Sequence, residues 1–251
     1  MKTVAENQLP QPTRRGFLKG AAAAAATLVA PGIFLYRTGQ AATALNDQAR
    51  WGLLIDTNAL SEADVDACVD ACRREHGWQV EQDSATDAQW VRKVKLTDQD
   101  TGHQKFLPMM CQHCESPPCV DVCPTGASFK RADGIVLVNK HTCIGCRYCM
   151  MACPYKARSF IHETLKDQLP VAPRGKGTVE SCTLCVHRID RDGANAMPAC
   201  AEAVNQNGRK AILFGDLNDP RSEISLRLQA LGGTRLRADM GLNPGVRYQG
   251  L

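Results

Sequence analysis

The chain has 251 residues, a formal net charge of +4 and 13 cysteines. Its length is enough for one large or two small domains, and so small a charge excludes a basic nucleic-acid-binding protein. The cysteine content is far above average usage, and eleven of the 13 lie between Cys111 and Cys200 in short clusters. This clustering is unlike a disulfide scaffold and indicates metal ligands.

The N-terminus has the pattern of a twin-arginine export signal. Arg14 and Arg15 precede an Ala-rich apolar run over 20–36, and the Ala-Thr-Ala sequence at 42–44 is a plausible cleavage site. The run is short for a transmembrane helix, which needs about 20 apolar residues, so a cleaved signal over 1–44 is favoured over a retained anchor. Export of a folded protein suits a chain that receives its metal centres in the cytoplasm, and it predicts a periplasmic location.

The first elements expected after the signal are a short apolar strand over 50–56 and a helix over 62–75. Ser61 is a suitable N-cap, and Asp64 supplies an acid three residues later. Apolar residues then follow at helical spacing, and Gly77 is a suitable stop. The sequence therefore predicts a well-delimited helix ahead of the cysteine clusters.

Alternating residues over 90–96 predict a half-buried strand. The first cysteine run follows it and is Cys111-x2-Cys114-x4-Cys119-x3-Cys123-Pro124. A strand over 135–138 then leads into the second run, which is Cys143-x2-Cys146-x2-Cys149-x3-Cys153-Pro154. The second run has the spacing of bacterial ferredoxins that hold [4Fe–4S] clusters, in which the fourth cysteine ligates the other cluster of a pair.

This spacing suits the chemistry of a four-iron cube. A tight turn lets the first three cysteines of a run converge on three irons, and Gly145 allows the backbone to approach the sulfides closely. Pro124 and Pro154 mark turns because proline has no backbone N–H donor. A zinc site uses paired C-x2-C units rather than four cysteines within eleven residues. The two runs therefore predict a pair of [4Fe–4S] clusters.

The C-terminal part begins with a linker rich in Pro and Gly over 170–177. A third cysteine group follows, which is Cys182-x2-Cys185-x14-Cys200. Alone it could be most of a zinc site, but beside two ferredoxin runs it favours a third cluster loop. A strand is expected over 211–214, and then a helix with Asp219 as its cap and Pro220 at N1, ending near Leu231. The basic, Gly-rich tail fits a solvated extension or a docking segment equally well.

Outside the signal, the whole chain resembles the four-motif ferredoxin-like subunits of bacterial redox complexes. This family includes the iron–sulfur subunits of dimethyl sulfoxide, tetrathionate and polysulfide reductases (DmsB type) and of formate-dependent nitrite reduction (NrfC type). The matching stretches are 51–56, the two runs ending in Cys-Pro, 182–185, 198–200, 215–220 and Asn243-Pro244. The resemblance implies sixteen cysteines and four [4Fe–4S] clusters, with motifs II and III sharing two clusters and motifs I and IV sharing two.

This chain departs from the family pattern in a consistent way. If Cys72 is the fourth cysteine of motif I, Glu62 and Val65 stand where two cysteines are expected, and Val204 replaces the last cysteine of motif IV. By the crossover rule, all three losses fall on one cluster, and Cys68 is its only remaining ligand. The twelve other cysteines therefore predict three complete clusters, with Cys68 left as a buried thiol.

The predicted ligand sets combine this rule with the family pattern. The first cluster takes Cys111, Cys114, Cys119 and Cys153. The second takes Cys143, Cys146, Cys149 and Cys123. The third takes Cys72, Cys182, Cys185 and Cys200. The chain is accordingly expected to bind three [4Fe–4S] clusters as its only cofactors.

The resemblance also implies a fold and a role. The fold expected is α+β and double ferredoxin-like, with a bicluster module over 106–169 inserted between the two parts of a first module, 45–105 and 170–251. An exported three-cluster member resembles the O subunits of DsrMKJOP-type membrane complexes of sulfur metabolism. Such a protein passes single electrons beside a quinone-interacting membrane subunit of the NrfD/DsrP type, and a periplasmic cytochrome c is a further candidate partner. The alternative is the electron-transfer subunit of an exported molybdoenzyme or of a nitrite, polysulfide or tetrathionate reductase.

Other residues are expected to play lesser roles. His113, within the first run, fits packing or tuning better than ligation because four cysteines are already available. Arg147 and Lys156 flank the second run and are expected to be solvated charges. A catalytic reductase would need an open iron or another cofactor site, and no nucleotide-binding G-x-G-x-x-G is present. A non-catalytic electron-transfer subunit is therefore expected.

Overall fold

The computed structural model describes residues 48–78, 86–166 and 168–251, so the export signal and its cleavage site lie outside the described residues. The strands are β1 (Trp51–Asp56), β2 (Val91–Thr97), β3 (Gln104–Met110), β4 (Ser128–Lys130), β5 (Val136–Val138), β6 (Ser159–Phe160), β7 (Val179–Glu180), β8 (Ile212–Asp216) and β9 (Val246–Gln249). The helices are α2 (Glu62–His76), α3 (Pro118–Asp121), α4 (Tyr148–Ala152), α5 (Val186–Asp192), α6 (Ala199–Val204) and α7 (Glu223–Leu231). Three 3-10 turns lie at Gly193–Asn195, Gln206–Gly208 and Ala238–Met240. These short helices and small sheets confirm the α+β class.

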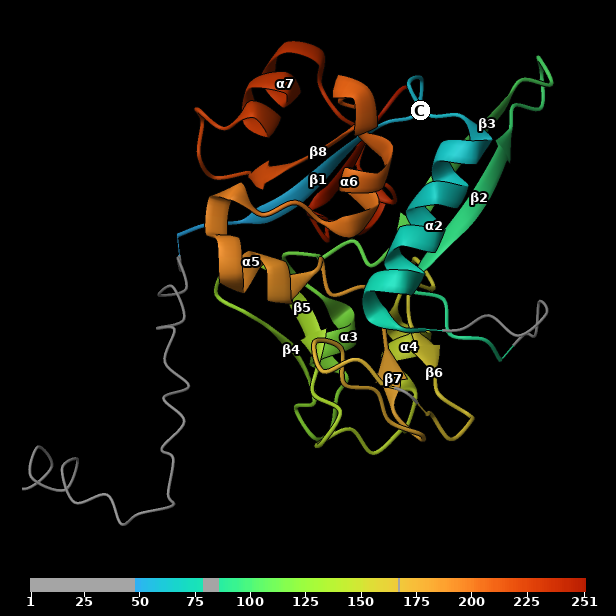
Figure 1. The fold of residues 1–251 in the computed structure, drawn as a ribbon, viewed down its shortest axis with the longest axis vertical. Coiled ribbons are helices and arrows are strands. Elements are labelled where there is room, and N and C mark those ends of the chain that lie inside the picture. The colour runs from blue at the N-terminus through green and yellow to red at the C-terminus, as the bar shows by residue number, and fades with distance from the viewer. Residues whose placement is uncertain (1–47, 79–85, 167) are drawn as a thin grey trace, which may run out of the picture. The chain divides into compact units, whose positions relative to one another are not determined.

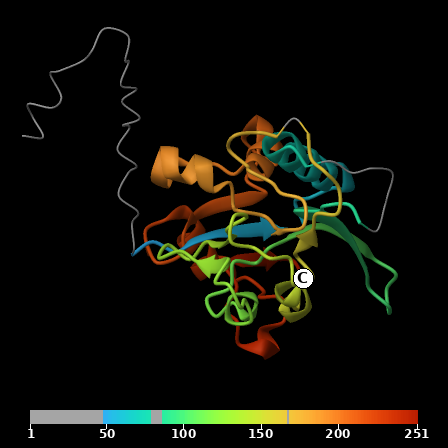
Figure 2. The same ribbon diagram turned by 90° about the horizontal axis from the view of Figure 1, so that it is seen from below.

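A three-stranded sheet in the order β8-β1-β9 organises the fold, with β1 antiparallel to β8 and parallel to β9. Successive residues of a strand face opposite sides, so Leu53 and Ile55 join the main core, whereas Leu54 packs with Ile224 of α7. In Figure 2 the teal α2 lies above the blue β1, and the short green and yellow helices α3 and α4 lie below it. The central strand is therefore buried on both faces.

Helix α2 forms as its local sequence predicts. The Ser61 side chain accepts a hydrogen bond from the backbone N–H of Asp64, and the Asp64 carboxylate accepts one from the N–H of Ser61, which completes a capping box. Gly77 ends the helix with a φ of 67°, a left-handed conformation that glycine adopts at little cost. In Figure 1, α2 lies alongside the hairpin formed by β2 and β3.

The two cysteine runs lie in a part of the chain with little regular structure. Each run contains a short helix, α3 or α4, near its C-terminal end and is followed by a strand of a short antiparallel hairpin, β4–β5 or β6–β7. These elements gather in the lower half of Figure 1, and the sheet of β1 and β8 lies in the upper half. The order of loop, short helix and hairpin agrees with the expected ferredoxin pattern.

The expected start of the last helix is wrong. Helix α7 begins at Glu223 with Ser222 as its N-cap, not at Asp219 and Pro220. The Asp219 carboxylate instead accepts from the N–H of Arg221 in a turn, while the Ser222 hydroxyl accepts from the N–H of Ser225. Of the two alternatives left open for the tail, a solvated extension fits the mostly exposed residues 233–242 but not β9, whose four residues are buried beside β1.

Strand β3 was not expected. Its sequence contains Pro108, which argues against a strand, yet Pro108 pairs opposite Lys93 in the β2–β3 hairpin.

Within the part of the chain that the structure describes, no helix has the length and apolar character needed to cross a bilayer.

Candidate iron–sulfur cluster sites

The first site is a small cavity lined by residues of both cysteine runs. Four cysteines contribute to its wall, and all four are buried: Cys111, Cys114, Cys119 and Cys153. Cys111 and Cys114 come from the loop between β3 and α3, Cys119 lies in α3, and Cys153 caps the end of α4. The last cysteine of the second run therefore lies among the thiols of the first run.

The second site is another small cavity. Its wall includes a complementary set of four cysteines: Cys123, Cys143, Cys146 and Cys149. Cys149 is buried and Cys146 is exposed. Cys123 comes from the first run and the other three from the second, so the two cavities exchange their fourth cysteines.

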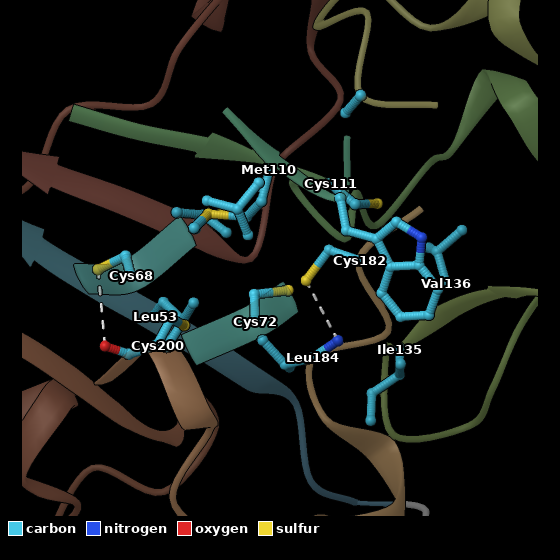
Figure 3. Close-up of a cluster of buried hydrophobic side chains, with 14 of the residues drawn as sticks. Leu53, Cys68, Cys72, Met110, Cys111, Ile135, Val136, Cys182, Leu184 and Cys200 are labelled. Atoms are coloured by element: carbon cyan, nitrogen blue, oxygen red, sulfur yellow. Dashed lines mark hydrogen bonds between the residues drawn. The ribbon is translucent and has the colours of Figure 1, made fainter. Parts of the chain in front are cut away.

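The third site gathers cysteines from three separate elements. Its four thiols are buried and influence one another electrostatically: Cys72, Cys182, Cys185 and Cys200. Cys72 lies near the C-terminal end of α2, Cys185 caps α5, and Cys200 lies in α6. Figure 3 shows Cys72 beside Cys182. A cysteine far away in the sequence thus joins the third group.

The three C-x2-C loops share one backbone feature. The residue just before the second cysteine has a positive φ in each, at His113 (44°), Gly145 (69°) and Leu184 (56°). Only the second loop uses glycine, and a Cβ on Gly145 would meet the carbonyl oxygen of Gly177. Glycine is required there by the neighbouring backbone. The common turn indicates that all three loops serve the same kind of ligand.

Polar N–H groups point at the sulfur atoms. Backbone N–H groups of Ser128 and Val179 donate to Cys123 and Cys143 at 3.3 and 3.5 Å. In the third site the donors are the N–H groups of Leu184 and Ala199, at 3.4 Å to Cys182 and Cys185, and the indole of Trp78, at 3.4 Å to Cys72. Donors aimed at sulfur stabilise thiolates and the clusters that they bind.

Burial alone opposes ionisation of these thiols. It raises the pKa of Cys111 and of Cys114 to about 12, and that of Cys200 to about 11. Thiols with such pKa values stay protonated at neutral pH, so a metal must displace the protons as it binds. Cys123 differs, because hydrogen bonds from Ser128 and Thr125 outweigh its small desolvation and lower its pKa.

The donor chemistry of the three sites fits [4Fe–4S] clusters. All 13 cysteines are free thiols, and cluster irons prefer thiolate ligands. Within the described residues, no three Cys, His, Asp or Glu side chains converge as the ligands of one metal ion would. The first two sets instead surround cavities, which is the arrangement that a cube of iron and sulfide needs.

The positions at which the family pattern would place ligands of a fourth cluster lie toward the N-terminal end of α2 and in α6. Glu62 is exposed and pairs with Lys93 at 2.9 Å, whereas Val65 and Val204 are buried in the packing of α2 against α6. The Cys68 thiol donates to the carbonyl oxygen of Cys200 at 3.6 Å (Figure 3). Burial raises the pKa of Cys68 strongly. Cys68 is therefore a protonated core thiol in this packing.

Arg158 is a site residue that sequence reasoning missed. Its guanidinium is 5 % exposed and donates through Nη2 to the Cys119 sulfur at 3.1 Å. Although burial opposes its charge, the neighbouring Cys119, Cys111 and Cys149 thiolates raise its pKa overall. The only signal in the sequence is an arginine five residues after Cys153, and that signal does not reveal burial. Arg147 and Lys156, which were expected to be solvated, are exposed.

A second polar group supports the third site. Glu75 accepts from His187 at 2.7 Å and from two nitrogens of Arg188 at 2.7 and 2.6 Å. These contacts join α2 to α5, the two elements that carry Cys72 and Cys185. His76 lies 3.4 Å from the Cys185 sulfur, and burial lowers its pKa to about 4, so the ring is neutral.

His113 is buried and accepts a backbone hydrogen bond. Its Nδ1 accepts from the backbone N–H of Val136 at 3.1 Å. Burial lowers its pKa to about 3, so the ring is neutral. These contacts agree with the expected packing role.

Comparison with known proteins agrees with this geometry. Residues 103–215 match the family described as a 4Fe-4S dicluster domain, and residues 11–31 match the twin-arginine translocation signal. The signal directs export to the periplasm. The dicluster match spans both cysteine runs and the third group.

Relatives with curated descriptions extend the match over nearly the whole chain. Hdr-like menaquinol oxidoreductase iron-sulfur subunit 1 of Archaeoglobus fulgidus is 40 % identical over 94 % of this chain and 97 % of its own. NrfC of Escherichia coli is 36 % identical over 92 % of each chain. A tetrathionate reductase subunit of Salmonella typhimurium is 42 % identical over 58 % of this chain and 52 % of its own.

These relatives include iron–sulfur subunits of oxidoreductase systems, and two of them match almost end to end. The export signal and the dicluster match agree with them. The chain therefore belongs to the family of exported, ferredoxin-like iron–sulfur subunits that transfer electrons within oxidoreductase complexes and are not themselves catalytic.

Proposed function

We propose that the chain holds three [4Fe–4S] clusters and relays single electrons within a membrane-associated redox complex of sulfur metabolism. The observation that carries this proposal is the grouping of twelve cysteines into three sets of four. The first set is Cys111, Cys114, Cys119 and Cys153. The second is Cys123, Cys143, Cys146 and Cys149. The third is Cys72, Cys182, Cys185 and Cys200.

The same grouping supports two ferredoxin-like modules. The first two sets draw only on the inserted segment 106–169. The third set draws on both flanking segments, 45–105 and 170–251, so these two segments form one module around a single cluster. Its second cluster position is filled by the side chains of Val65, Cys68 and Val204.

The bound clusters supply sites that accept and release single electrons. The protein's part is to bind and tune them. The thiolates hold the irons, the backbone N–H groups at Ser128 and Leu184 donate to sulfur, and buried side chains such as Trp78 exclude water from the third site. Burial and N–H donors are the means by which a protein sets cluster potentials. No group of the chain has to act as an acid, base or nucleophile.

The partner proposed is an integral-membrane, quinone-interacting subunit of the NrfD/DsrP type, with a periplasmic cytochrome c as a further candidate. The end-to-end similarity to a menaquinol oxidoreductase subunit supports a quinone-linked complex, and the export signal supports a position at the periplasmic face of the membrane. The three-cluster pattern favours a role like that of the DsrO subunit. A role in a tetrathionate reductase system is the second candidate, supported by a higher identity over a shorter stretch.

Purification of the tagged full chain from detergent-solubilised host membranes, under anaerobic conditions, tests this proposal. We expect a polytopic membrane subunit to co-purify, and a menaquinol analogue to reduce the clusters in the complex but not in the isolated chain. Co-purification of a molybdenum-containing subunit in its place would favour the second candidate. Equal reduction with and without the membrane subunit would contradict the proposed partner.

A further inference from the structure

Arg158 lies between two of the cysteine sets. It contributes to the wall of the first cavity, and Nη2 donates to Cys119 of the first set at 3.1 Å. Burial raises the pKa of Cys149, which belongs to the second set, and the Arg158 guanidinium opposes this rise through its charge and a side-chain hydrogen bond. One cation therefore faces thiols of both sets.

The environment of Arg158 is incomplete without an anion. The side chain is 5 % exposed, and its Nε and Nη1 atoms are buried without a hydrogen-bond partner among the described residues. Its neighbours in the described structure include no carboxylate within ion-pair distance. Burial of an unpaired cation is costly, so this position requires negative charge in the space around it.

The only anionic groups that the site offers are cysteine thiolates, and a cluster held by four thiolates would add inorganic sulfides. The guanidinium has five N–H donors in a planar fork, and one nitrogen reaches a thiol already. The remaining donors have the right chemistry to meet sulfide or thiolate sulfur on either side.

We propose that Arg158 is a positioning residue that donates hydrogen bonds to the clusters of both the first and the second site and raises both reduction potentials. The proposal rests on the proposed function, because it needs clusters at these two sites. Uptake of an electron makes a cluster more negative, and a buried cation and N–H donors favour that state. By tuning two neighbours together, one side chain keeps their potentials close and favours electron transfer between them.

The third site is an internal reference. Burial is the main cause that raises the pKa values of its four thiols, neighbouring cysteines, Trp78, Glu75 and Arg188 have smaller effects, and Arg158 is not among the main contributors. A change at Arg158 should therefore leave the third cluster's potential unaltered. Arg147 is the matched control, since it is exposed beside the second site and its guanidinium stacks on Phe160 at 4.0 Å.

The test is an EPR-monitored potentiometric titration of the anaerobically purified full chain and its Arg158→Gln, Arg158→Lys and Arg147→Gln variants. For Arg158→Gln we expect the equilibrium constant for one-electron reduction to fall about tenfold or more at two of the three clusters, which is about 59 mV per tenfold. Arg158→Lys, which keeps the charge but not the fork, should lower it less. Arg147→Gln should change it by less than about threefold because water and salt screen an exposed charge.

Unchanged potentials in Arg158→Gln, with full iron content, would overturn the inference, and so would a shift no larger than that of Arg147→Gln. A wild-type chain that binds no iron at the first two sites would overturn the proposed function instead. If Arg158→Gln binds too little iron to titrate, the wild-type protein labelled with guanidino-¹⁵N arginine carries the test. Pulsed EPR should then detect ¹⁵N hyperfine coupling to a reduced cluster, and its absence would overturn the inference.

Discussion

The two ends of α2 differ in what surrounds their buried side chains. Near its C-terminus, Cys72 lies with three other buried thiols in the third candidate site. Toward its N-terminus, Val65 and Cys68 are buried on a helix that packs against α6, in which Val204 is also buried. Cys68 and Cys72 are only one turn apart and are both buried, so burial does not distinguish a candidate ligand from a core residue.

The difference lies in what surrounds each thiol. Cys72 receives an N–H donor from Trp78 and faces Cys182 and Cys200. Cys68 instead donates to a carbonyl oxygen, a contact that requires the protonated thiol. A cluster site therefore needs convergent thiols with donors aimed at them, and a single cysteine in an apolar contact is only a small hydrophobic residue.

Removing a ligand of the third site is expected to have the largest effect. In Cys200→Ser we expect iron to fall from about twelve to about eight atoms per chain, because one four-iron cluster is lost. Cys68→Ser is the matched control, since serine can still donate to the same carbonyl oxygen, and its iron content should stay at the wild-type value. Colorimetric iron analysis measures both. Equal iron loss in the two variants would contradict the claim that Cys200 is a cluster ligand and Cys68 is not.

Truncating a buried side chain in the packing of α2 against α6 should lower the stability of the protein without loss of iron. Val204 is 2 % exposed, so Val204→Ala should lower the free energy of unfolding by about 2 kcal/mol. That corresponds to a thermal midpoint about 4 to 8 °C lower for a chain of this size. The exposed Val171 provides the control, and Val171→Ala should leave the midpoint almost unchanged. If Val204→Ala also lost four irons, a fourth cluster would have to lie there.

Loosening α2 from α5 should destabilise only the third cluster. Glu75→Gln weakens charge-assisted hydrogen bonds to Arg188 and His187 and should cost about 1.5 kcal/mol. We expect faster loss of one cluster to an iron chelator, followed by visible absorbance. Glu202→Gln, at the more exposed partner of Arg188, should have a smaller effect.

The effect of Glu75 also depends on pH. Hydrogen bonds from Arg188 and His187 lower its pKa to about 2 from an ordinary value of 4.5. The stabilisation is therefore complete above about pH 4.5 and is lost as the pH falls toward 2. The difference in the free energy of unfolding between cluster-free wild type and cluster-free Glu75→Gln should shrink in that range, and chemical denaturation of the cluster-free chains measures it because acid decomposes the clusters. A difference that persists there would mean that the carboxylate charge is not what holds the two helices.

The smallest change should come from the helix cap. Ser61→Ala removes the hydroxyl that accepts from the Asp64 N–H and should cost about 1 kcal/mol, or about 2 to 4 °C in the thermal midpoint. Iron content should not change, because the cap belongs to the end of α2 without a cluster. Ser116→Ala, in an exposed loop, serves as the control. A loss of iron in Ser61→Ala would connect this end of the helix to a cluster.

Features that depend on residues close together in the chain were predictable from the sequence. The capping box at Ser61 and Asp64 and the stop at Gly77 depend on residues within one or two turns, and cysteine spacing identified the loops around Cys143. The sequence of β9 gave no comparable signal, because its burial depends on pairing with β1, where Val246 meets Leu53 from the opposite end of the chain.

Arg158 was missed for a related reason. Its meaning comes from a contact with Cys119, 39 residues earlier in the chain, and from a cavity that exists only after the cysteine loops fold. The expected cap at Asp219 failed because Ser222, three residues later, competes for the same role and also accepts from the N–H of Ser225. Long-range pairing and competition between nearby caps are not encoded in single motifs.

The most direct test is the number of iron and acid-labile sulfide atoms per chain in anaerobically purified protein. Three [4Fe–4S] clusters require about twelve of each, and this is the result that we expect. About sixteen would place a fourth cluster at the N-terminal end of α2 and contradict the apolar packing of Val65, Cys68 and Val204. About eight would leave the set of Cys72, Cys182, Cys185 and Cys200 without a cluster and contradict the three-cluster relay.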